Sequence, residues 1–170
     1  MRTGRLGSLR HLERGFTLLI MLGLVAVLSL GVGAAGAAWR DGAQREREAE
    51  WLRIGNVYAQ AIEAYLANSP GTVKQGPTRL EDLLADTRFV GIRRHLRQAY
   101  ADPLQPSKAW ALLKDEKSQI VGVYSTANGE PFLRQAPAGS RLKARSTGDG
   151  YARWAFVASQ PSTAASRPSK

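Results

Sequence analysis

The sequence predicts an α+β protein in which a long N-terminal helix, apolar in its first half and amphipathic in its second, packs on a small antiparallel sheet. Three features carry this prediction: an uncharged block near the N-terminus, a following stripe of apolar residues at helical spacing, and short strand-like runs between turn residues towards the C-terminus. With 170 residues, the chain is long enough for one modest domain with an appendage.

The uncharged block covers residues 16–39 and contains 24 residues without a charge. A helix of that length measures about 36 Å, whereas the hydrocarbon core of a bilayer is about 30 Å thick. The block is apolar on all faces, unlike a helix on the surface of a soluble protein. We therefore expect residues 16–39 to form a transmembrane helix half.

The charges on the two sides of this block differ. Residues 1–15 carry four arginines and one glutamate, whereas residues 40–48 mix both signs. By the positive-inside rule, we expect the N-terminus in the cytoplasm and the bulk of the chain outside it. The net charge is +10, of which residues 1–15 supply +3. The remaining basic residues are scattered among acidic ones, so nucleic acid is not an expected partner.

Three interpretations of the N-terminus are compatible with these residues. An ordinary secretory signal could be cleaved at the small residues Ala35-Gly36-Ala37. The block could instead be an uncleaved signal anchor. A third possibility is a leader that is cut before the block, so that the apolar helix stays attached to the mature chain.

The junction between the basic segment and the block resembles that of type IV prepilins and type II secretion pseudopilins. Gly15 matches the glycine that ends the leader in this family, and Phe16 matches the residue that becomes N-terminal and N-methylated. Thr17 and Leu18 match the residues that commonly follow. The resemblance implies cleavage and methylation by a prepilin peptidase, and an assembly helix that begins at Phe16.

The sequence departs from this family at Ile20, because the fifth position of the mature chain is normally a glutamate. A carboxylate in lipid is costly, so a family keeps it for a reason. Its proposed role is to pair with the N-terminal ammonium of a neighbouring subunit, which an isoleucine cannot do. The pseudopilin thought to sit at the filament tip also lacks this glutamate. The departure therefore suggests a tip, minor or divergent subunit.

The helix is expected to continue beyond the apolar block to Ala67. Residues 43–50 are strong helix formers, and the Asn-Ser-Pro-Gly segment at residues 68–71 is a stop signal. Apolar side chains then recur at steps of three and four, which predicts one buried face: Trp51, Ile54, Tyr58, Ile62, Tyr65 and Leu66.

Shorter elements are expected in the rest of the chain. A capping box at residues 78–81 predicts a short helix up to Leu84 or Ala85, and residues 89–100 predict another short helix or a turn. Strands are expected at four places: residues 110–113, 120–125, 131–134 and 151–158. The first two form a hairpin through residues 115–118. Residues 134–150 are expected to be a loop, and the Ser/Pro-rich end to be disordered.

The middle of the chain is also similar to the secretion-pseudopilin domain. Residues 78–83 look like its P-x-x-L-x-x-L segment, and Asp102-Pro103, a tryptophan strand and Gly-Val-Tyr-Ser at residues 122–125 follow. The resemblance covers about residues 14–134 and implies the pilin fold. The expected domains are a prepilin leader (1–15), the transmembrane helix half (16–39), a periplasmic pilin-like domain (40–158) and a disordered tail (159–170).

Little in the sequence indicates catalysis. The chain has no cysteine, and no nucleophile or phosphate-loop motif is present. His95 lies among Arg93, Arg94 and Arg97 and is expected to be a surface residue. Three aspartates have no partner that can be recognised from the sequence: Asp82, Asp86 and Asp102. We therefore expect no enzyme and no cofactor.

A calcium site is not expected either. Some major pseudopilins bind calcium through a loop near the C-terminus, and the matching region here offers Asn128, Glu130 and Asp149. Calcium prefers six to eight oxygen ligands, usually with several carboxylates. These residues are too few, so no metal site is predicted.

The expected function is that of a structural pseudopilin subunit of a type II secretion system or a related type IV pilus-like machine. The implied location is the bacterial inner membrane, with a single span, a cytoplasmic N-terminus and a periplasmic domain. The implied partners are other pseudopilins or pilins, the prepilin peptidase and the inner-membrane assembly platform. The alternatives are a minor type IV pilin, for example one that serves DNA uptake, and an exported periplasmic binding module with an ordinary signal peptide.

Overall fold

The computed structural model describes the backbone of residues 9–159 and, within that range, the side chains of residues 16–29 and 39–159. The chain divides into two compact units, residues 1–44 and residues 45–170. We call the described part of the second unit, residues 45–159, the sheet domain. The expected tail lies outside the described residues except for residue 159, and so do residues 1–8 of the expected leader.

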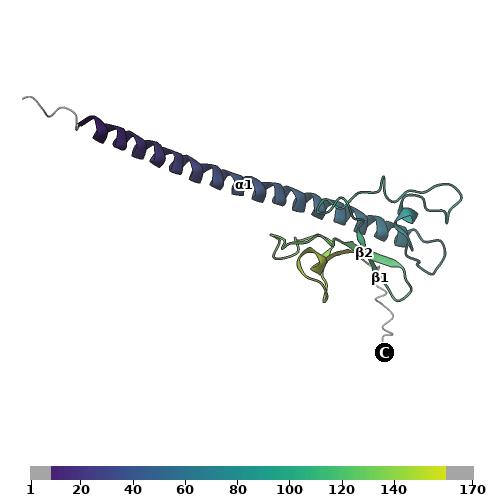
Figure 1. The fold of residues 1–170 in the computed structure, drawn as a ribbon. Helices are drawn as coiled ribbons and strands as arrows, with labels where there is room; N and C mark the ends of the chain where they lie inside the picture. The colour runs from purple at the N-terminus through teal and green to yellow at the C-terminus, as the bar shows by residue number, and fades with distance from the viewer. Residues whose placement is uncertain (1–8, 160–170) are drawn as a thin grey trace, which may run out of the picture. The chain divides into compact units, whose positions relative to one another are not determined.

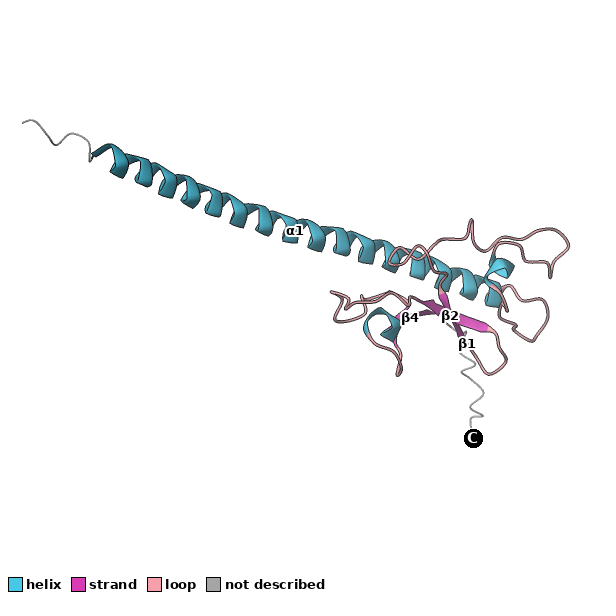
Figure 2. Ribbon diagram, in the orientation of Figure 1, coloured by secondary structure: helices cyan, strands magenta, loops and turns pink. Residues whose placement is uncertain are grey.

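The protein is α+β, as predicted, and residues 9–159 contain one α-helix and a four-stranded antiparallel sheet (Figure 1). The elements, in chain order, are α1 (Leu9–Ala67), the 3-10 helix η1 (Leu80–Leu83), β1 (Ala111–Lys114), β2 (Ile120–Tyr124), β3 (Leu142–Ala144), the 3-10 helix η2 (Gly150–Arg153) and β4 (Trp154–Val157). The strand order is β1-β2-β4-β3, so β2 and β4 form the centre of the sheet (Figure 2).

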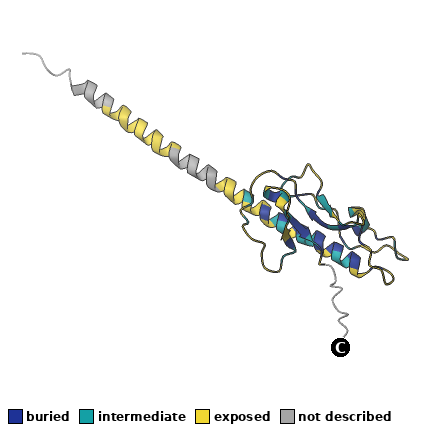
Figure 3. Ribbon diagram, turned by 90° about the horizontal axis from the view of Figure 1, so that it is seen from below, coloured by how far each residue is buried: buried dark blue, intermediate teal, exposed yellow. Residues whose placement is uncertain are grey.

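The core lies between the C-terminal part of α1 and the sheet, where the buried residues gather in Figure 3. Every residue of the predicted apolar stripe is buried, which confirms that prediction. The ring of Trp51 packs edge-on against Phe156 of β4, with 4.9 Å between ring centroids. Further along α1, the ring of Tyr58 lies 5.7 Å from that of Trp110. The helix and the sheet therefore share one hydrophobic core.

The predicted end of the long helix is confirmed, because α1 ends at Ala67 before the Asn-Ser-Pro-Gly segment. Its start differs from the prediction, because α1 begins at Leu9 rather than at Phe16. Residues 9–14 read Leu-Arg-His-Leu-Glu-Arg, and leucine, arginine and glutamate are good helix formers. The helical backbone therefore includes the end of the expected leader.

Strand predictions hold for the hairpin of β1 and β2 and for β4, with shifts of at most three residues at the ends. The predicted strand at residues 131–134 is wrong. Pro131 has no N–H to donate, and the N–H of Phe132 donates to Glu48 Oε1 on α1 (3.0 Å) instead of to a strand. The remaining strand of the sheet, β3, lies within the segment that was predicted to be a loop. Its Leu142 pairs with Phe156 of β4.

The region between α1 and the sheet contains less helix than predicted. The expected helix to Leu84 or Ala85 is the four-residue η1, and its capping carboxylate is Asp82 rather than Glu81. Asp82 Oδ2 accepts hydrogen bonds from the backbone N–H groups of Thr78 and Arg79, each at 3.0 Å. Residues 89–100 form turns and bends, so of the two predicted alternatives the turn is present and the helix is not.

Gly55 gives a first test of how closely α1 approaches the sheet. A Cβ placed at Gly55 would overlap the ring of Phe156. Alanine favours helix over glycine by about 1 kcal/mol, but overpacking a core costs about 1–3 kcal/mol or more. We therefore expect Gly55→Ala to lower the free energy of unfolding, measured by denaturant titration. Gly42→Ala is the matched control, because nothing lies within 4 Å of a Cβ there. Equal effects of the two variants would contradict the close approach.

Candidate functional site

The residues of the predicted cleavage and assembly site are consecutive positions of α1. The bond between Gly15 and Phe16 lies within the helix, and the side chains are described from Phe16 onwards. Phe16, Leu18 and Ile20 are 65%, 63% and 55% exposed, and Thr17 is exposed as well. Large apolar side chains stay exposed as far as Leu28. Across the residues that the structure describes, no helix is both long enough and apolar enough to cross a membrane.

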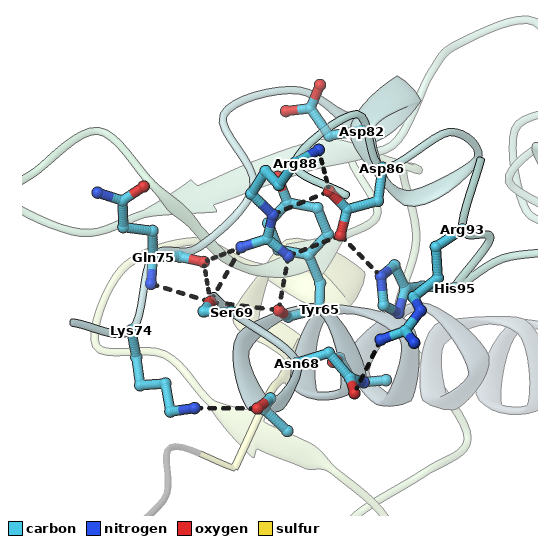
Figure 4. Close-up of polar contacts among 12 residues, drawn as sticks. Tyr65, Asn68, Ser69, Lys74, Gln75, Asp82, Asp86, Arg88, Arg93 and His95 are labelled. Carbon is cyan, nitrogen blue, oxygen red and sulfur yellow. Dashed lines mark hydrogen bonds and ion pairs between the residues drawn. The ribbon is translucent and has the colours of Figure 1, made fainter. Parts of the chain in front are cut away.

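A polar network links the end of α1 to the loops that follow it (Figure 4). We call it the Asp86 network, and its members are Tyr65, Ser69, Gln75, Asp86, Arg88 and His95. Tyr65 belongs to α1, and the other members lie after it in segments without regular secondary structure. The network therefore depends on long-range contacts rather than on a sequence motif.

Arg88 and Asp86 form its centre. Arg88 Nε donates to Asp86 Oδ1 at 2.9 Å, and Arg88 Nη2 donates to Asp86 Oδ2 at 2.7 Å. The Asp86 side chain is completely buried. The Arg88 side-chain hydrogen bonds hold the pKa of the Asp86 carboxyl well below its usual range, although burial opposes this shift. The same hydrogen bonds raise the pKa of Arg88 above its usual value. Both groups are therefore charged near neutral pH.

His95 is the second partner of Asp86, and the expectation that it lies on the surface is wrong. Its side chain is 4% exposed, and His95 Nε2 lies 3.0 Å from Asp86 Oδ2. A charged carboxylate only accepts hydrogen bonds, so Nε2 carries the proton in this contact. The imidazole also packs edge-on against the Tyr65 ring, with 5.4 Å between centroids.

Arg88 also caps the C-terminus of α1. Its Nη2 donates to the carbonyl oxygen of Tyr65 at 2.9 Å, and its Nη1 donates to Ser69 Oγ at 2.9 Å. The guanidinium carbon lies 3.5 Å from the centre of the Tyr65 ring. A cation at this end of a helix satisfies carbonyls that have no partner within the helix and complements the helix dipole. Because its donors and acceptors pair with one another, we interpret the network as a structural element that holds the loops against the end of α1, rather than as a reactive site.

The other two aspartates also have partners. Asp82 caps η1, as described above. Asp102 is buried and accepts hydrogen bonds from the Ser125 hydroxyl and from the backbone N–H of Leu104, the latter at 2.9 Å. This aspartate fastens the turn around Pro103 to the end of β2. The partners of Asp86 and Asp102 could not be recognised from sequence, because they lie in distant segments or in irregular turns.

Two recesses lie elsewhere in the sheet domain. One, of about 450 Å³, is lined by apolar and aromatic side chains that include Tyr58, Tyr100 and Trp110. The other, of about 300 Å³, brings together Asn128, Glu130 and Asp149. Within the described residues, no group of three or more histidine, aspartate or glutamate side chains is arranged to hold a metal ion.

Comparison with known proteins identifies no relative of the chain. It matches no family model, no curated protein and no solved structure. The function is therefore inferred from the residues at the N-terminal junction and from the architecture of the fold.

Proposed function

We propose that this chain is a pilin-like structural subunit, a pseudopilin of a type II secretion system or of a related type IV pilus-like machine. The observation that carries the proposal is the junction at Gly15 and Phe16. A basic leader ends there in glycine, and Phe-Thr-Leu opens a block of 24 uncharged residues. An ordinary secretory signal does not require this order of residues.

The architecture is compatible with such a subunit. A long helix opens the chain, and its C-terminal part supports a small antiparallel sheet. The large apolar side chains near its N-terminus are exposed. So many exposed apolar side chains must be shielded from water. Lipid shields them before assembly, and neighbouring helices shield them in a filament. The proposed anchor is residues 16–39, of which the side chains at 30–38 lie outside the described part.

In this proposal a prepilin peptidase removes residues 1–15 and methylates the new N-terminus at Phe16. Before assembly, the subunit stays anchored in the inner membrane with its domain in the periplasm. It then joins other pseudopilins or pilins at the inner-membrane assembly platform. Ile20 offers no carboxylate to the N-terminal ammonium of a neighbour, so a tip or minor position is favoured over a repeating one.

Processing at Gly15 tests the proposal directly. The chain is expressed with a prepilin peptidase, and its intact mass and N-terminal sequence are measured after extraction from membranes. We expect a chain that begins at N-methylated Phe16, and we expect Gly15→Val to retain its leader. Gly7→Val is the matched control, because it changes a leader glycine away from the junction and is expected to be processed normally.

Other outcomes would contradict the proposal. Processing that persists in Gly15→Val would mean that this glycine is not the recognised residue. A mature chain that begins near Ala38 would favour an exported periplasmic module with an ordinary signal peptide. A chain that still begins at Met1 in the presence of active peptidase would favour a simple signal anchor.

A further inference from the structure

Residues 87–97 form a loop that is held firmly at its base. We call this segment the basic loop. The backbone N–H of Asp86 donates to the carbonyl of Arg93 at 2.8 Å, which forms an isolated antiparallel bridge across the loop. The N–H groups of His95 and Leu96 both donate to the carbonyl of Leu83 at 2.9 Å. The Asp86 network fixes the same base from inside. The tip of the loop is therefore presented on a prearranged support.

Two aliphatic side chains project from this tip. Val90 is 110% exposed and Ile92 is 75% exposed, which makes them the most exposed large hydrophobic residues among the described residues of the sheet domain. They flank Gly91, whose φ of +103° is a turn conformation that favours glycine. Folding buries neither side chain, so this pair adds nothing to the core. Because the base of the loop is fixed, the two side chains are held where they can contact something outside the domain.

Exposed arginines follow these aliphatic residues directly. Arg93, Arg94 and Arg97 are exposed, and Arg94 and Arg97 line an open recess of about 400 Å³ with His95 and Leu96. Among the described residues, neither Arg94 nor Arg97 forms a hydrogen bond or an ion pair with another group. The nearby carboxylate of Asp86 is already bound by Arg88 and His95. The positive charge of the basic loop is therefore available to an anion.

We propose that the basic loop docks on the surface of an anionic phospholipid bilayer. Val90 and Ile92 enter the boundary between headgroups and acyl chains. The guanidinium groups of Arg94 and Arg97 bind a lipid phosphate at the recess between them, which suits the bidentate geometry of arginine. Because the base of the loop is already fixed, docking costs little ordering of the backbone.

The form of the exposed residues favours a bilayer over an acidic protein. A stable protein interface buries about 800 Å² on each partner and requires matching shapes. Here the exposed apolar surface consists of two separate side chains, Val90 and Ile92, and the unpaired guanidinium groups follow them in the chain. An amphipathic surface of this kind binds a membrane interface through buried apolar area and attraction to anionic lipids, without a shaped partner.

The absence of cysteine allows the tip to be labelled at one position. Val90 is replaced in the full chain (Val90→Cys), and an environment-sensitive fluorophore is attached to the new thiol. The labelled chain is then incorporated into two kinds of bilayer, one of phosphatidylcholine alone and one of phosphatidylcholine mixed with phosphatidylglycerol. A quencher attached to the lipid headgroup region reports proximity to the membrane. Val73→Cys is the matched control, because Val73 is also an exposed aliphatic loop residue, at 65%, and lies outside the basic loop.

With phosphatidylglycerol present, we expect a blue-shifted emission and strong quenching at residue 90, and neither at residue 73. One arginine near an anionic surface is worth about a fivefold change in the ratio of docked to undocked loops. Arg94→Gln combined with Arg97→Gln should therefore lower that ratio roughly twenty-five-fold. Higher salt should lower it as well, because salt screens the attraction.

Three results would overturn the proposal. The first is equal quenching at residues 90 and 73, and the second is equal docking on phosphatidylcholine alone. The third is a blue shift without lipid quenching that grows with protein concentration, which would assign the tip to a contact with a second copy of the chain. The readout at residue 90 does not depend on cleavage after Gly15, so this test and the processing test fail separately.

Discussion

Asp86→Ala is expected to lower the free energy of unfolding of the sheet domain by about 3–5 kcal/mol, the usual cost of removing one partner from a buried ion pair. The completely buried Asp86 carboxylate binds both Arg88 and His95. Its loss leaves the Arg88 guanidinium, 17% exposed, without the charge that compensates it. The base of the basic loop and the cap of α1 should loosen together.

Denaturant titration of the full chain in detergent, followed by tryptophan fluorescence, measures this loss. Glu81→Ala is the control, because Glu81 is a carboxylate of the same region whose ion pair with Arg79 is largely exposed. Such exposed pairs contribute less than about 1 kcal/mol. If Asp86→Ala costs no more than Glu81→Ala, the network does not stabilise the fold as its geometry indicates.

The pH dependence of stability gives an independent check on Asp86. Hydrogen bonds from Arg88 lower the pKa of Asp86 in the folded state, so the unfolded chain binds this proton first as the pH falls. The contribution of Asp86 is therefore complete above about pH 5 and is lost progressively as the pH falls through the unfolded value of about 3.9 towards the folded one. We expect Asp86→Ala to lose less stability than the unaltered chain over this acidic range.

The long helix could be predicted from sequence because its signals are local. The buried face between Trp51 and Leu66 repeats at the helical period, and the stop at residues 68–71 follows directly. The signals for the hairpin of β1 and β2 are also local, because a polar turn lies between two apolar runs. In contrast, β3 has three residues and one buried side chain, Leu142, which is too short for an alternating pattern.

The Asp86 network could not be predicted in the same way. Arg88 and His95 lie two and nine residues from Asp86, in a segment whose path depends on contacts with Tyr65 and Ser69 at the end of α1. No periodic pattern encodes such a path. His95 was expected on the surface because its neighbours in sequence are arginines, yet the chain turns its ring inwards and theirs outwards. The proposed processing signal at Gly15 differs, since a peptidase motif is a run of adjacent residues.

Trp51→Ala is expected to have an effect of similar size, about 3–5 kcal/mol, because it replaces a large aromatic side chain in the centre of the core with a cavity. Trp51 is completely buried, and its ring contacts Phe156 of β4 at 4.9 Å and Tyr151 of η2 at 5.6 Å between centroids. One side chain of α1 thus holds both the central strand β4 and the short helix that precedes it.

Amide hydrogen exchange of η2 and β4 in the full chain should detect this loss as faster exchange in those elements. Trp51→Phe is the matched variant, because it keeps an aromatic ring and removes an indole Nε1 that is buried without a hydrogen-bond partner among the described residues. A buried unpaired N–H is unfavourable, so its removal offsets part of the lost contact area. We therefore expect a much smaller effect for phenylalanine than for alanine. Equal acceleration in the two variants would contradict the assignment of this effect to packing of the aromatic ring at position 51.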